Sequence, residues 1–151
     1  MKTRMSAFAF AGIVLIGLIV ADVVSAQRSM VVREEDGVFM STDWGRIKVL
    51  LGPKELERKT LTPAGEAKYL MIVITEYATA TEHKLHTHPD QEEVIYILEG
   101  EGISRTKDGD QPLHPGSFAY VPAGVDHATI NVRKDRPLKA IIIKNLPQKG
   151  K

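Results

Sequence analysis

The sequence contains no cysteine and no basic cluster, and each absence removes a class of function. Without cysteine, the 151-residue chain can form no disulfide and can carry out no thiol chemistry. Its 20 basic side chains are scattered and nearly balanced by 19 acidic ones, so nothing favours nucleic-acid binding. No stretch keeps the apolar period of an amphipathic helix. The length suits one domain with a single core.

The only long apolar run lies at the N-terminus and has the features of a secretory signal peptide. Lys2 and Arg4 come first, an apolar run of 15 residues follows at 7–21, and Val24-Ser25-Ala26 supplies small residues for cleavage. The run is shorter than the ~20 residues that span a bilayer. We therefore expect cleavage after Ala26 rather than a retained membrane anchor, and an exported protein that is periplasmic or secreted.

Short strands bounded by turn residues make up most of the remaining chain. Runs of β-branched and apolar residues predict strands at 46–51, 67–77, 94–98, 102–106, 111–114, 117–121, 126–132 and 140–143. Asp108-Gly109 is typical of a hairpin turn, and 54–59 is consistent with a helical turn. The predicted organisation is a signal peptide at 1–26, a linker and edge strand at 27–40, an all-β barrel at 41–146 and a polar tail at 147–151.

Three of the predicted strands, 67–77, 94–98 and 140–143, are apolar at both odd and even positions. The strands of a small isolated barrel would show polar residues on their outer face. Either the N-terminal segment folds over the barrel or two copies pack sheet on sheet. We predict a homodimer.

Side chains that can bind metals are concentrated between residues 86 and 131. His86 and His88 are two positions apart, so on a strand they share a face. Glu93 and His127 add a carboxylate and a third imidazole. Nitrogen and oxygen ligands without sulfur suit a divalent transition metal, such as iron, manganese, nickel, cobalt, copper or zinc, better than calcium or magnesium.

The spacing of these residues resembles the two motifs of the cupin family. The first motif, G-x5-H-x-H-x3,4-E-x6-G, matches from His86 to Gly100, but Ala80 stands in place of its leading glycine. The second, G-x5-P-x-G-x2-H-x3-N, matches at every fixed position from Gly116 to Asn131. The resemblance implies a small jelly-roll β-barrel, commonly dimeric, whose metal is held by His86, His88, Glu93 and His127.

Several residues near the motifs have competing interpretations. Glu93 is preferred to Glu92 as the carboxylate, because Glu93 lies seven residues before Gly100 as the first motif requires. His83 is out of parity with the two motif histidines, so it is predicted to face the other way, and His114 is predicted at the surface. Asn131 is expected either to support the metal ligands or to pin the end of its strand.

No pattern identifies a catalytic residue besides the metal ligands, and Lys84 and Tyr96 are the candidates. Lys84 has the parity of the motif histidines and could bind a substrate carboxylate, although a solvated lysine at the rim is preferred. Tyr96 and Tyr120 are more typical of strand packing. Trp44 is expected to pack at the end of the barrel rather than to line a pocket.

These observations favour an exported metalloenzyme, dioxygenase-like or lyase-like, acting on a small oxygenated organic acid or phenol. The presence of all four ligands favours it over a protein that binds small molecules or sugars without catalysis. A carbohydrate-modifying enzyme of the isomerase type is the third interpretation. The motifs do not decide among them, because this fold hosts many unrelated activities.

Overall fold

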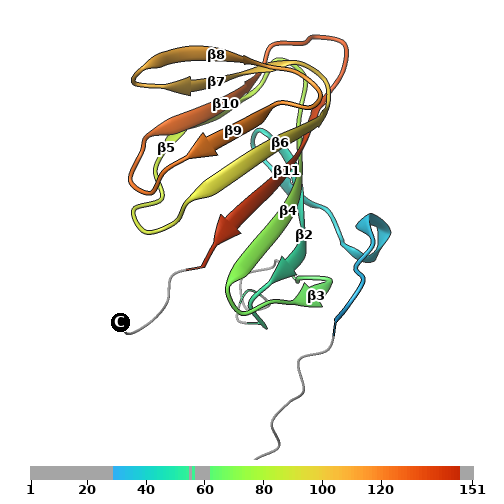
Figure 1. The fold of residues 1–151 in the computed structure, drawn as a ribbon. Coiled ribbons are helices and arrows are strands. Elements are labelled where there is room, and N and C mark those ends of the chain that lie inside the picture. Colours follow the sequence, from blue (N-terminus) through green and yellow to red (C-terminus); the bar gives the residue numbers. More distant parts are fainter. Residues whose placement is uncertain (1–28, 55, 57–61, 147–151) are drawn as a thin grey trace, which may run out of the picture.

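The computed structural model describes residues 29–54, 56 and 62–146, which form an all-β fold (Figure 1). A short 3-10 helix, η1 (Glu34–Asp36), comes first. The strands are β1 (Met40–Thr42), β2 (Gly45–Gly52), β3 (Gly65–Glu66), β4 (Leu70–Tyr77), β5 (Glu82–His86), β6 (Glu93–Glu99), β7 (Gly102–Thr106), β8 (Gly109–Leu113), β9 (Phe118–Val121), β10 (His127–Asn131) and β11 (Leu138–Asn145). Within these residues, no helix is long and apolar enough to cross a membrane. The expected signal peptide, the tail and most of the predicted turn at 54–59 lie outside the described residues.

The strands form two antiparallel sheets, as Figure 1 shows. The larger sheet has the order β1-β2-β4-β11-β6-β9, with β3 added in parallel beside β2. The smaller sheet has the order β5-β10-β7-β8. The prediction of an all-β fold is therefore confirmed.

Most strand boundaries differ from the predicted ones by one to three residues, and two of these differences have a visible cause. The strand predicted from residue 67 begins at Leu70, because the Ala67 amide donates to the Gly52 carbonyl at 2.8 Å and turns the chain there. The predicted hairpin at Asp108-Gly109 is present, but its second strand begins at Gly109, which pairs with Thr106. Both differences are small shifts at strand ends.

The core lies between the two sheets and is built from alternate residues of the central strands. Odd positions of β4 and β6 and even positions of β11 point inward. The buried apolar cluster consists of Val49, Val73, Tyr77, Ile95, Ile97, Leu113, Leu138, Ala140 and Ile142.

The N-terminal segment, residues 29–39, covers part of the outer face of the larger sheet. The Lys48 ammonium lies 3.4 Å from a Glu34 carboxylate oxygen, donates to the Glu34 carbonyl at 3.0 Å and sits 4.1 Å from the centre of the Phe39 ring. Lys139 on β11 reaches the same carboxylate at 2.8 Å. Ile74, the cross-strand neighbour of Lys48, is consequently buried on the outer face. Of the two kinds of cover predicted for the apolar strands, the N-terminal segment is therefore the one present over β2 and β4.

The outer face at β6 and β9 has no such cover among the described residues. The Tyr96 ring packs at 4.5 Å against the Phe118 ring, and Phe118 is still 71% exposed. Tyr120, two residues along β9, is 60% exposed. A contiguous exposed aromatic surface of this kind is costly in water and is typical of an interface.

We propose that a second copy of the chain covers this aromatic surface. Light scattering at micromolar concentration is expected to give twice the mass of one chain. Phe118→Asp is expected to give monomers, because a carboxylate cannot be buried there without a partner. Leu85→Asp on the opposite sheet is the control and should remain dimeric. A monomeric wild-type protein would contradict the proposal.

Asn131 joins the end of β10 to two neighbouring loops. Its side-chain amide lies 3.0–3.1 Å from the carbonyls of Tyr77, Ala78 and Arg136, and its side-chain oxygen accepts from the Arg133 amide at 2.9 Å. The side chain is almost wholly buried. Of its two predicted roles, the structure shows that of pinning the strand end.

Ala80, where the first motif has glycine, takes up a left-handed backbone conformation with φ of 54°. It lies in the turn between β4 and β5, where the chain passes from one sheet to the other. The Ala80 amide donates to the Arg133 carbonyl at 2.8 Å, and the adjacent Thr81 carbonyl accepts from the Asn131 amide at 2.9 Å. The turn therefore keeps a shape that suits glycine even though its residue is alanine.

Ala80→Gly is accordingly expected to stabilise the protein. Relief of the left-handed strain should exceed the added freedom of the unfolded chain, giving a gain of about 0.5–1 kcal/mol in the free energy of unfolding. Denaturant unfolding measures this change. Ala78→Gly in the same turn is the control and should destabilise the protein, since Ala78 has no positive φ. Equal losses in both variants would show that the turn is unstrained.

Candidate metal centre

Three histidines come together at one end of the core. His86 on β5 and His127 on β10 are direct cross-strand partners. His88 follows β5, and its carbonyl accepts from the Gly124 amide at 2.8 Å, which ties it to the turn before β10. One ring nitrogen of each histidine lies within 4.8 Å of the others. The side chains can therefore converge on one ion.

The hydrogen bonds of two of these rings leave the metal-binding nitrogen free. His86 Nδ1 lies 2.8 Å from the Lys84 carbonyl, and His127 Nδ1 lies 3.0 Å from the Val125 carbonyl. A carbonyl can only accept, so each Nδ1 carries the proton and each Nε2 keeps its lone pair. Both Nε2 atoms are buried without a hydrogen-bond partner. Unsatisfied buried acceptors are costly, and a metal ion would satisfy them.

Glu93 reaches the histidines from the larger sheet. It is 4% exposed, and its carboxylate oxygens lie 3.4 Å from His88 Nε2 and 3.7 Å from His127 Nε2. Glu92 points outward and accepts a hydrogen bond of 2.8 Å from the Tyr120 hydroxyl. Of the two carboxylates, Glu93 is the one inside the pocket.

The surroundings disfavour charge on His86 and His88 and keep the Glu93 carboxylate ionised. Burial lowers the pKa of His86 and of His88, and the nearby Lys144 ammonium lowers that of His88 further. Burial alone would raise the pKa of Glu93, but His127 and Lys144 outweigh it and lower the value to about 2. Burial likewise disfavours charge on His127, yet Glu93 raises its pKa. Neutral imidazoles and a carboxylate are the forms that bind a metal.

His83 lies in the pocket, so the prediction that it faces away is wrong. Its ring is 4.1 Å from the His86 ring and 4.3 Å from Trp44. The cause is an irregularity in the pairing of β5 with β10. His86 pairs with His127 and His83 pairs with Thr129, so four residues of β5 oppose three residues of β10. The extra residue in β5 changes the parity, as a β-bulge does. Burial then lowers the pKa of His83 to about 4.

The same bulge moves Lys84 out of register with the motif histidines. Lys84 is exposed and does not line the cavity, while its carbonyl holds the His86 ring. Tyr96 lies on the outer face of β6 against Phe118, and it does not line the cavity either. His114 is exposed, as predicted.

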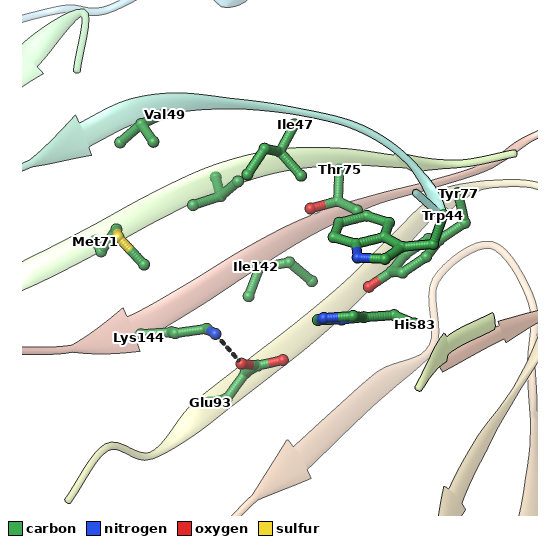
Figure 2. A pocket seen from close by; sticks show the side chains of 11 residues that line it. Trp44, Ile47, Val49, Met71, Thr75, Tyr77, His83, Glu93, Ile142 and Lys144 are labelled. Carbon is green, nitrogen blue, oxygen red and sulfur yellow. Dashed lines mark ion pairs between the residues drawn. The ribbon is translucent and has the colours of Figure 1, made fainter. Parts of the chain in front are cut away.

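A cavity of about 110 Å³ lies beside the centre (Figure 2). Five apolar side chains form its walls: Ile47, Val49, Met71, Val73 and Ile142. Trp44, Tyr77 and His83 line one part of it, and Glu93 and Lys144 line another. Trp44 packs on Tyr77, with ring centres 5.2 Å apart, so it is a packing residue and a pocket residue at once.

Sequence reasoning missed Lys144. It lies on β11 directly opposite Glu93, and its ammonium is 2.6 Å from the Glu93 carboxylate and 2.8 Å from His88 Nε2. The signal was the alternation of Leu138, Ala140, Ile142 and Lys144, which places the lysine on the inward face.

Residues 73–144 match the family model described as a cupin domain. This part of the chain is a cupin domain. The match includes the histidines, Glu93 and Lys144, so the metal centre and one wall of the cavity belong to the domain. Among curated protein sequences, none is similar enough to this chain to count as a relative.

Solved cupin structures share the fold. KdgF from Halomonas sp. is 11% identical, with a TM-score of 0.63 over 81% of this chain and 97% of that one. A predicted oxalate decarboxylase from Thermotoga maritima is 22% identical, with a TM-score of 0.59 over 78% and 100%. The DMSP lyase DddQ from Ruegeria pomeroyi is 20% identical, with a TM-score of 0.59 over 76% and 59%. At these identities the similarity establishes the fold alone.

Replacing the proposed ligands one at a time is expected to show which carboxylate, Glu93 or Glu92, binds the metal. His88→Ala and His127→Ala should lose most bound metal, and Glu93→Gln should bind it at least about tenfold more weakly because its charge is removed. Glu92→Gln should bind metal as the wild type does. Metal content by elemental analysis, with circular dichroism to check folding, measures this. Full metal content in His127→Ala, or loss in Glu92→Gln alone, would contradict the assignment.

Proposed function

We propose that the protein is an exported metalloenzyme that acts on a small oxygenated organic molecule. The observation that carries the proposal is the convergence of three imidazoles and one buried carboxylate beside a cavity. Unpartnered Nε2 atoms of His86 and His127 fit a divalent transition metal. Export rests on the signal-peptide features of residues 1–26.

In this proposal, His86, His88, His127 and Glu93 hold the metal. A transition metal held by these residues would supply Lewis-acid chemistry to the oxygens of a substrate in the cavity. The backbone carbonyls at Lys84 and Val125 orient two of the rings. The apolar walls of the cavity exclude water from the bound molecule and strengthen every charge interaction beside it.

The walls of the cavity argue against a carbohydrate. A sugar needs hydrogen-bond partners for its many hydroxyl groups, and five of the lining side chains are aliphatic or thioether groups. The cavity therefore gives the isomerase alternative less support, although one structural neighbour, from Silicibacter pomeroyi, is named as a sugar phosphate isomerase. Dioxygenase-like and lyase-like reactions both suit a small acid held at a metal, and two of the structural neighbours are named as a lyase and a predicted decarboxylase.

Turnover by metal-loaded protein tests the proposal. We expect a panel of short carboxylic acids, hydroxy acids and phenols to contain a compound that is consumed with bound metal and not by His127→Ala. An oxygen electrode and proton NMR distinguish the two reaction types. Dioxygen uptake that matches substrate loss indicates a dioxygenase, and loss without uptake indicates a lyase.

Binding without consumption would contradict the enzyme proposal. If metal-loaded protein binds members of the panel and returns them unchanged with and without dioxygen, the protein is a non-catalytic binding cupin. His127→Ala must be folded by circular dichroism for the comparison to count.

A further inference from the structure

Lys144 is placed at the centre without a role in holding the metal. Its side chain is 13% exposed, and it points inward beside Glu93, as the dashed line in Figure 2 shows. Lysines are seldom buried unless they are paired. Here the partners are the Glu93 carboxylate and His88 Nε2, which are two of the four groups assigned to the metal.

A metal bound by those two groups would take the His88 lone pair away from Lys144 and would share the Glu93 carboxylate with it. At least one Glu93 oxygen and the His88 lone pair would then be directed at the ion. The ammonium would stand beside a divalent cation in a partly buried pocket, where like charges repel strongly. Lys144 therefore opposes metal binding unless a further anion joins the site.

The charges of the lining residues lead to the same conclusion. Among the described residues that line the cavity, Glu93 and Lys144 are the two with a formal charge, and they cancel. A divalent ion adds two positive charges that no lining side chain balances. An anionic ligand would balance part of this excess and would give Lys144 a new partner.

The cavity sets the size and character of that anion. Its volume of about 110 Å³ is somewhat smaller than the ~150 Å³ of an apolar cavity that binds benzene, so it suits a body of about four carbons. A carboxylate has two oxygens, one for the metal and one for Lys144. A phosphate carries further charged oxygens that would need several donors, whereas five of the lining side chains are apolar.

We propose that Lys144 is the anion-binding residue of this site and that its ligand class is a short monocarboxylate with an apolar body. The carboxylate bridges the metal and the ammonium, and the body fills the space between Ile47, Val73 and Ile142. The proposal rests on the metal centre proposed above. It replaces Lys84, which is exposed, as the lysine that holds a substrate carboxylate.

Titration of the protein with Co²⁺ and then with butyrate tests the proposal, because visible absorption of Co²⁺ reports both steps. We expect butyrate to bind the Co²⁺-loaded wild type at least about tenfold more tightly than acetate, which lacks two methylene groups. The uncharged 1-butanol should bind no more tightly than acetate.

The variant Lys144→Met should change the two affinities in opposite directions. Co²⁺ should bind several-fold more tightly than to the wild type, because a competing cation is removed. Butyrate should bind at least about tenfold more weakly, because its charged partner is lost. The variant Lys84→Met is the matched control and should match the wild type in both steps.

Three results would overturn the proposal. Equal butyrate affinity in Lys144→Met and wild type would show that the lysine does not bind the anion, and loss in Lys84→Met instead would assign the role to that residue. Weaker Co²⁺ binding in Lys144→Met would show that the lysine only supports the fold. A wild type that binds no Co²⁺ would overturn the proposed metal centre itself. This failure is distinguishable from the others, because it is observed in the first titration, before butyrate is added.

Discussion

Two cross-strand pairings determine the position of the whole centre. On the smaller sheet β10 places His127 opposite His86, and on the larger sheet β11 places Lys144 opposite Glu93. Each pair points inward, so two imidazoles face a carboxylate and an ammonium across the gap between the sheets. The apolar core below supports the second pair, because Ile142 and Ile95 lie on the same faces two residues away. A slip of one residue in either pairing would turn these side chains outward and remove the centre.

Much of this arrangement could be predicted from the sequence, because it depends on local patterns. The spacing of His86 and His88, the distance from Glu93 to Gly100 and the turn before His127 each reflect a requirement of the backbone. Gly124 shows why: it has a φ of 77° and its amide holds the loop of His88. Runs of apolar and β-branched residues likewise predicted the central strands, although their ends shifted.

The sequence prediction missed two residues of the pocket, His83 and Lys144. The parity of β5 is broken by a bulge that exists only in its pairing with β10, so His83 lies inside, while Lys84 is exposed as preferred from the sequence. Lys144 was hidden because β11 is apolar on both faces, one packed in the core and the other lying outside. Trp44 was expected to pack rather than to line a pocket, and it does both. These contacts are properties of the folded chain.

A row of stacked rings connects the core with the metal centre and has an optical consequence. Tyr77, Trp44, His83 and His86 follow one another with ring centres 4.1–5.2 Å apart. Trp44 is the single tryptophan of the chain, so the indole fluorescence of the protein comes from a residue two rings away from the metal ligand. Ions with partly filled d shells quench indole emission at short range, whereas zinc does not. If His86 binds a transition metal as proposed, Trp44 would serve as a built-in fluorescent reporter of metal loading.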